Sequence, residues 1–110
     1  MEIQQLLQLV VDKKASDLHL VVGIAPTLRI DGELVRIPNE PALSREEAER
    51  LIKGILNAEQ LERVTVNKDI DFSLAFSQDA RFRVNVYYQK GSIGAAFRRI
   101  PLKVPTIDEL

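Results

Sequence analysis

Residues 80–100 are the stretch that most restricts how this chain can fold, because apolar and polar side chains alternate along almost all of it. A period of two is typical of a half-buried β-strand. Apolar residues recur at every second position from Phe82 to Tyr88 and again at Ile93, Ala95 and Phe97 after Lys90-Gly91, so we predict two antiparallel strands joined by a two-residue loop. In that register Tyr88 faces Ile93, Val84 faces Phe97, and the whole of one face is apolar.

On the polar face of the same hairpin, Arg83 falls directly opposite Arg98. Like charges opposed on a sheet repel each other. Two interpretations stay open at this point. The pair can be a binding site for an anion, since guanidinium groups hold phosphate or carboxylate through paired hydrogen bonds. Alternatively, both arginines are solvated and their repulsion is screened by water and salt.

Residues 69–76 alternate in the same way and predict a third strand of this meander. A three-residue loop, Ser77-Gln78-Asp79, pairs its apolar face with that of the next strand and sets Ser73 beside Arg83 on the polar face. Two hairpins built independently then agree on which face is the core, and this consistency supports the register.

The first two thirds of the chain predict helices and shorter strands. We expect an amphipathic helix over residues 1–14, a strand over 17–22, a hairpin over 27–37 around Asp31-Gly32, and a helix over 44–56 that begins with a Ser44–Glu47 capping box. A short helix capped by Asn57 follows. These elements predict an α+β domain with six strands, in which about three helices cover one face of a mostly antiparallel sheet. The other face carries Arg29, Arg36, Arg83, Asn85 and Arg98.

Composition limits the classes of function. The 110 residues suffice for one domain, and 45% hydrophobic with 28% charged residues is typical of a soluble globular protein. A net charge of −1 argues against nucleic acid as a partner. The chain contains no cysteine, so it has no disulfide and no thiolate metal site. Its N-terminus lacks the apolar run of a signal peptide.

We identify no catalytic residues and no metal ligands. The chain has no G-x-x-x-x-G-K-[ST] motif for nucleotide phosphates. His19 is the single histidine, which is too few for a triad or a zinc site, and we expect it to be a structural residue at a strand edge. Asp69 and Asp71 are an acid–base pair by spacing alone, but carboxylates on a strand facing arginines are more often ion-pair partners.

Five segments in order resemble the N-terminal domain of the type II/IV secretion ATPases, and within that family the type IV pilus retraction ATPases. The segments are ASDLHL at 15–20, IDG at 30–32, DFS at 71–73, RFRVN at 81–85 and AFRRIP at 96–101. The resemblance implies a PAS-like fold over residues 1–100, with 101–110 as the start of a linker to a RecA-like ATPase domain. That domain would supply the P-loop, the Mg²⁺ site and the glutamate base, so this part of the protein would not be an enzyme alone.

The resemblance also implies partners and site residues. The parent protein would form a homohexameric ring on the cytoplasmic face of the inner membrane, beside the pilus platform protein. Arg83 and Arg98 match the arginines that reach the phosphates of ATP on the following domain, with Arg81 and Asn85 as further candidates. We expect no cofactor on the isolated domain and assign no role to Asp17 or His19. The alternatives are a stand-alone PAS-like module for a ligand or partner and a structural domain at a subunit interface.

Overall fold

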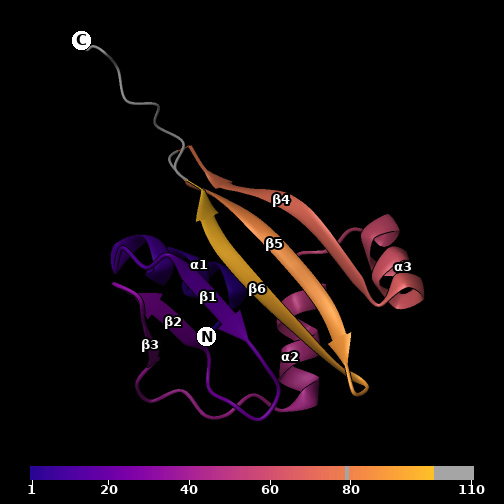
Figure 1. Ribbon diagram of the computed structural model, residues 1–110, viewed down its shortest axis with the longest axis horizontal. Helices are drawn as coiled ribbons and strands as arrows, with labels where there is room; N and C mark the ends of the chain where they lie inside the picture. The colour runs from indigo at the N-terminus through magenta and orange to yellow at the C-terminus, as the bar shows by residue number, and fades with distance from the viewer. Residues whose placement is uncertain (79, 101–110) are drawn as a thin grey trace.

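A computed structural model describes residues 1–78 and 80–100 as one six-stranded sheet with three helices (Figure 1). The strand order is β3-β2-β1-β6-β5-β4, and every neighbouring pair is antiparallel. The α+β prediction is therefore confirmed. The elements are α1 (Ile3–Asp12), β1 (Asp17–Leu20), β2 (Thr27–Ile30), β3 (Glu33–Arg36), α2 (Arg45–Lys53), α3 (Ala58–Asn67), β4 (Asp69–Ser77), β5 (Ala80–Gln89) and β6 (Ser92–Ile100).

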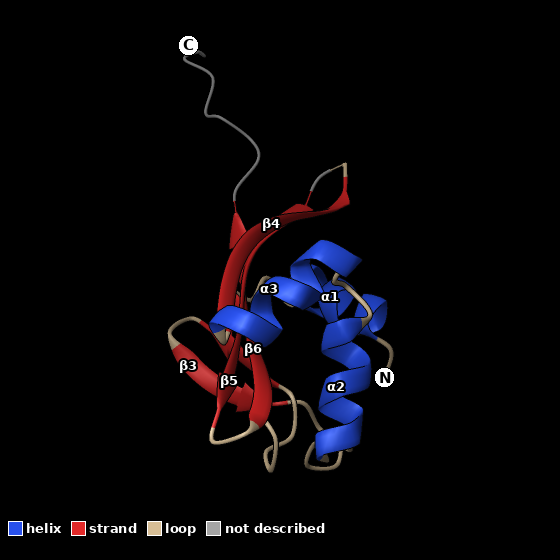
Figure 2. Cartoon of the chain, turned by 90° about the vertical axis from the view of Figure 1, so that its right-hand side faces the viewer, coloured by secondary structure: helices blue, strands red, loops and turns tan. Residues whose placement is uncertain are grey.

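The core lies between the helices and one face of the sheet. Figure 2 shows α1 and α2 on the same side of the strands, and α3 packs against β4 and β5. Phe82 and Phe97 are fully buried at the centre of this face, where their rings meet edge to face with centroids 6.5 Å apart. This geometry is favourable for aromatic rings. No helix of the described residues covers the opposite face of the sheet, which we call the outer face.

The predicted registers of both long hairpins are confirmed. Leu74 pairs with Phe82, Val84 with Phe97, and Arg83 with Arg98. Lys90 and Gly91 both have positive φ, at 53° and 79°, as a two-residue type I′ turn requires. Asp31 and Gly32 adopt the same geometry, at 51° and 82°.

The loop between β4 and β5 is shorter than predicted. Ser77 pairs with Ala80, and the register shifts between Ala75 and Ser77. A bulge near Phe76 therefore absorbs one residue, so the rest of the predicted pairing is preserved. Asp79 of the predicted loop and the predicted linker 101–110 lie outside the described residues.

The second helix ends at Lys53, three residues earlier than predicted, and two other predictions about element ends were partly wrong. The Ser44 hydroxyl accepts from the Glu47 N–H at 3.1 Å as expected, but the Glu47 carboxylate binds Arg50 in a fork instead of completing the capping box. The first strand stops at Leu20, and Val22 forms an isolated parallel bridge with Leu43. None of the helices in the described part of the chain is long and apolar enough to cross a membrane.

Candidate functional site

A line of charged side chains crosses the outer face from strand to strand. The pairing places Arg29 on β2 opposite Asp17 on β1, Asp17 opposite Arg98 on β6, and Arg98 opposite Arg83 on β5. We call these four residues the arginine row. It holds three guanidinium groups and one carboxylate in a chain that is nearly neutral overall, so this part of the surface is locally basic.

Asp17 is the buried member of the row, with 6% of its surface exposed. Its Oδ1 accepts from Nε of Arg98 at 3.1 Å, and its Oδ2 accepts from the Ser16 hydroxyl at 2.7 Å. Nε of Arg29 lies 3.7 Å from Oδ2. Burial opposes ionisation of Asp17, but the hydrogen bonds from Ser16 and Arg98 outweigh it and hold the pKa of this carboxyl below its usual value. Asp17 is therefore an ionised anchor between two arginines.

Arg98 and Arg83 present the guanidinium groups of the predicted pair to solvent. The Arg98 side chain is 74% exposed although its Nε is held by Asp17. Arg83 is exposed and forms no hydrogen bond or ion pair within residues 1–78 and 80–100. The predicted opposition of the two arginines is confirmed, and Asp17 offsets part of their repulsion. What they bind stays a prediction.

The structure does not bring Arg81 and Asn85, the further candidates, into the same arrangement. Nη1 of Arg81 donates to the Ser73 hydroxyl at 2.8 Å, and Nδ2 of Asn85 donates to the Ile70 carbonyl at 3.2 Å. Both side chains thus brace β5 against β4. Asp69 and Asp71 are exposed and form none of the ion pairs found among the described residues, so the expected pairing with arginines was wrong.

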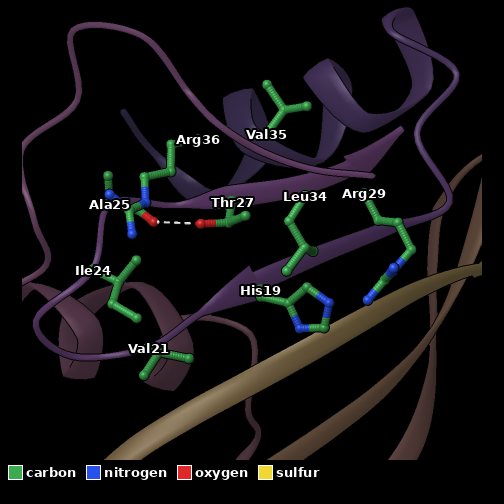
Figure 3. Close-up of a pocket in the computed structure, with 9 residues that line it drawn as sticks. All are labelled: His19, Val21, Ile24, Ala25, Thr27, Arg29, Leu34, Val35 and Arg36. Carbon is green, nitrogen blue, oxygen red and sulfur yellow. Dashed lines mark hydrogen bonds between the residues drawn. The ribbon is translucent and has the colours of Figure 1, made fainter. Parts of the chain in front are cut away.

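A groove of about 780 Å³ lies on the outer face over β1, β2 and β3, and Arg29 of the arginine row is one of the residues that line it. Figure 3 shows the His19 ring beside the side chains of Leu34 and Arg29, with Ile24 farther along. Leu34 and Ile24 are 60% and 40% exposed, while Arg36 adds a positive charge. The surface combines apolar contact area with basic groups. Nowhere in the described part of the chain do three His, Cys, Asp or Glu side chains come together as a metal site would need.

Sequence reasoning missed Asp17 as a partner of Arg98. The two residues are 81 positions apart and meet only because β1 lies next to β6 at the centre of the sheet. Alternation already placed Asp17 and Arg98 on polar faces of their strands. The missing information was which strands are neighbours, and local patterns do not contain it.

Comparison with known proteins identifies relatives over the whole chain, although no family model matches. The type IV pilus retraction ATPase PilT of Pseudomonas aeruginosa is 42% identical over 110 residues, and the type IV pilus ATPase PilU of the same organism is 33% identical over 110 residues. The chain covers 32% and 28% of these relatives, so it spans about a third of their length.

Solved structures of related ATPases have the same fold as this chain. The chain superposes over its full length on the pilus retraction motor PilT with bound ADP, with a TM-score of 0.89, 32% identity and 32% of that chain covered. The ATPase DotB of Legionella pneumophila matches over 99% of this chain and 32% of its own, with a TM-score of 0.76 and 26% identity. The chain therefore belongs to the type II/IV secretion ATPase family and corresponds to the N-terminal domain of a pilus ATPase of the PilT type.

Proposed function

We propose that this domain works in a pilus retraction ATPase, where Arg83 and Arg98 bind the phosphates of ATP held by a RecA-like domain of the same protein. The observation that carries the proposal is the opposition of two exposed guanidinium groups on neighbouring strands. The relatives are named as ATPases, and one was solved with ADP.

The chemistry of phosphate fits such a pair. A guanidinium group binds phosphate oxygens through two parallel hydrogen bonds, and it keeps its charge at any physiological pH. An anion between two opposed arginines is attracted by both of their charges at once, and its own charge offsets the repulsion between them. The N–H groups required for this are the terminal ones of Arg98 and those of Arg83, which have no partner in the described residues.

Arginines delivered by a separate domain couple hydrolysis to motion. They bind ATP when the two domains are closed and lose that contact when the domains open, so ATP favours the closed arrangement. They also neutralise charge that develops on the transferring phosphoryl group. Under this proposal the nucleotide-binding domain supplies the P-loop, Mg²⁺ and base, and the present domain alone neither hydrolyses ATP nor binds it tightly.

The wider setting belongs to the same proposal. The protein would assemble as a homohexameric ring at the cytoplasmic face of the inner membrane, contact the pilus platform protein, and power pilus retraction in twitching motility. The support is similarity to PilT, PilU and a protein named for twitching motility from Neisseria gonorrhoeae, which is 35% identical over 85 residues.

The test is ATP turnover by a protein that contains both domains. Replacing Arg83 or Arg98 with alanine should lower kcat/KM on the order of 100-fold, which is typical for loss of one preorganised donor to a transition state. Arg63→Ala is the matched control, because Arg63 is an exposed arginine on α3 whose ion pair with Glu59 lies within one helix. Turnover within twofold of wild type in both Arg83→Ala and Arg98→Ala would refute the clamp.

The groove supports a second candidate function, contact with a neighbouring subunit or other protein. The observation is the exposed Leu34 beside His19 and Arg36, which offers an apolar side chain and a basic group to a partner. The two candidates depend on different residues. The clamp needs Arg83 and Arg98, whereas a contact surface here needs Leu34.

A further inference from the structure

Asp17 has a geometry that matters for how Arg98 can bind an anion. The carboxylate is buried, and a buried charge is stable only when it is paired and hydrogen-bonded. Its oxygens are satisfied by Ser16 and Arg98, with Arg29 nearby. The carboxylate is thus fixed by its own surroundings before any ligand arrives.

Arg98 is held by one end only. The contact to Asp17 uses Nε, which leaves both terminal NH₂ groups without a partner in the described part of the chain. A guanidinium group has five N–H donors in a rigid planar fork, so fixing Nε also limits the direction of the two terminal nitrogens. An arginine anchored at its Nε therefore offers a prepared pair of donors.

The neighbouring contacts make the anchor specific for Arg98. Arg29 also faces Asp17, but its Nε is 3.7 Å from Oδ2 and its Nη1 donates to the Gly32 carbonyl at 2.9 Å. Arg29 is therefore turned to the β2–β3 hairpin. Arg83 stands on the other side of Arg98 with no contact to a carboxylate in the described residues. Without Asp17, repulsion from Arg83 would favour conformations in which Arg98 turns away.

We infer that Asp17 is a positioning residue, which holds Arg98 by Nε so that its terminal nitrogens and Arg83 bind one phosphate group together. The inference rests on the clamp proposed above and assigns a role to the aspartate of the ASDLHL segment. Asp17 does not touch the nucleotide. It restricts the conformations of the Arg98 side chain before binding, so that less conformational entropy is lost when the phosphate binds.

The experiment is a double-mutant cycle on ATP turnover, in a protein that contains both domains. Asp17→Asn keeps the shape of the side chain but removes its charge and one acceptor. We expect it to lower kcat/KM about tenfold, mainly through KM, as expected when a preorganised contact loosens. In an Arg98→Ala background the same substitution should change kcat/KM by less than about twofold, because nothing is left to position.

Asp71→Asn is the control. Asp71 is an exposed aspartate on the same face, opposite Asn85, and takes part in no ion pair among the described residues. It loses the same charge and should retain wild-type kinetics. A merely structural role of Asp17 would lower the amount of active protein, and hence kcat, by the same factor in both backgrounds with KM unchanged.

The outcomes separate the two proposals. If Arg98→Ala lowers turnover but Asp17→Asn has no effect, or an equal effect in both backgrounds, the positioning role is overturned and the clamp survives. If Arg98→Ala itself has no effect, both are overturned. Should Asp17→Asn fail to fold, Arg98→Lys is the second variant, since it keeps Asp17 and the charge but lacks the guanidinium fork. We expect the kcat/KM of Arg98→Lys to lie within threefold of that of Arg98→Ala. A wild-type KM in Arg98→Lys would overturn the inference.

Discussion

Gly94 on β6 faces Tyr87 on β5, and the tyrosine ring lies across the space that a side chain would fill. A Cβ added at Gly94 would stand 2.8 Å from Cε1 and Cζ of Tyr87, where ordinary contact begins at 3.4 Å. Gly94→Ala therefore requires the ring to move by at least about 0.6 Å. Overpacking of this kind costs roughly 1–3 kcal/mol. Gly94 does not have positive φ, so alanine can adopt its backbone conformation. The substitution then lowers the conformational entropy of the unfolded chain, which stabilises the folded state by about 0.4–1 kcal/mol. The difference between the two ranges is a net destabilisation of about 0–2.6 kcal/mol, and because the atoms in the way are the far end of the half-exposed Tyr87 side chain, we expect a value near 1 kcal/mol.

Urea unfolding followed by circular dichroism measures this cost in two backgrounds. In Tyr87→Ala the clash is absent, so Gly94→Ala should become neutral or stabilising by up to about 1 kcal/mol. Burial raises the pKa of Tyr87, and a displaced ring should show a lower pKa; titration in a Tyr88→Phe background isolates this group, because the chain has only two tyrosines. An equal destabilisation in both backgrounds, with the pKa of Tyr87 unchanged, would refute the steric argument.

Two further predictions concern Asp17 and the groove. The folded-state pKa of Asp17 lies below its usual value near 3.8, so its contribution to stability is present above that pH and is lost as pH falls through the lower, folded-state pKa. Below about pH 4, the free energy of unfolding should therefore fall less steeply with pH in Asp17→Asn than in the wild type. Parallel curves of unfolding free energy against pH for the two proteins would contradict this. Leu34→Asp should change stability by less than about 0.5 kcal/mol, because Leu34 is 60% exposed. If the groove contacts a neighbouring subunit, Leu34→Asp should weaken subunit assembly as measured by sedimentation. The control Glu33→Gln, on the opposite side of β3, should assemble like the wild type. Unchanged assembly of Leu34→Asp would exclude the groove as an interface.

The local parts of this fold were predictable because each is specified by neighbouring residues. The type I′ turn at Lys90-Gly91 needs two residues with positive φ, and the alternation on either side allows only one register with an apolar face. The opposition of Arg83 and Arg98 followed from that register alone. This half of the candidate site was therefore available from residues 80–100.

The remainder depended on contacts that no local pattern contains. Asp17 and Arg98 meet through the adjacency of β1 and β6, which is a property of the whole sheet. Two donors are available to the Glu47 carboxylate, the Arg50 guanidinium and the Ser44 N–H that a capping box requires. The carboxylate accepts from Arg50, because hydrogen bonds between charged groups are stronger. In both cases competition between possible partners decided the outcome.

The junction of β1 with β6 also has a consequence for how the domain folds. Among the described strands it is the only pairing that joins β1–β3 to β4–β6, and it connects residues 17–20 with 95–98. Each half is built from hairpins that close short loops, whereas the junction closes a loop of nearly the whole domain, at a larger entropic cost. During synthesis the first three strands must wait for β6 before the sheet can be completed. Asp17 and Arg98 sit at this junction, so an oriented Arg98 exists only in molecules that have finished folding.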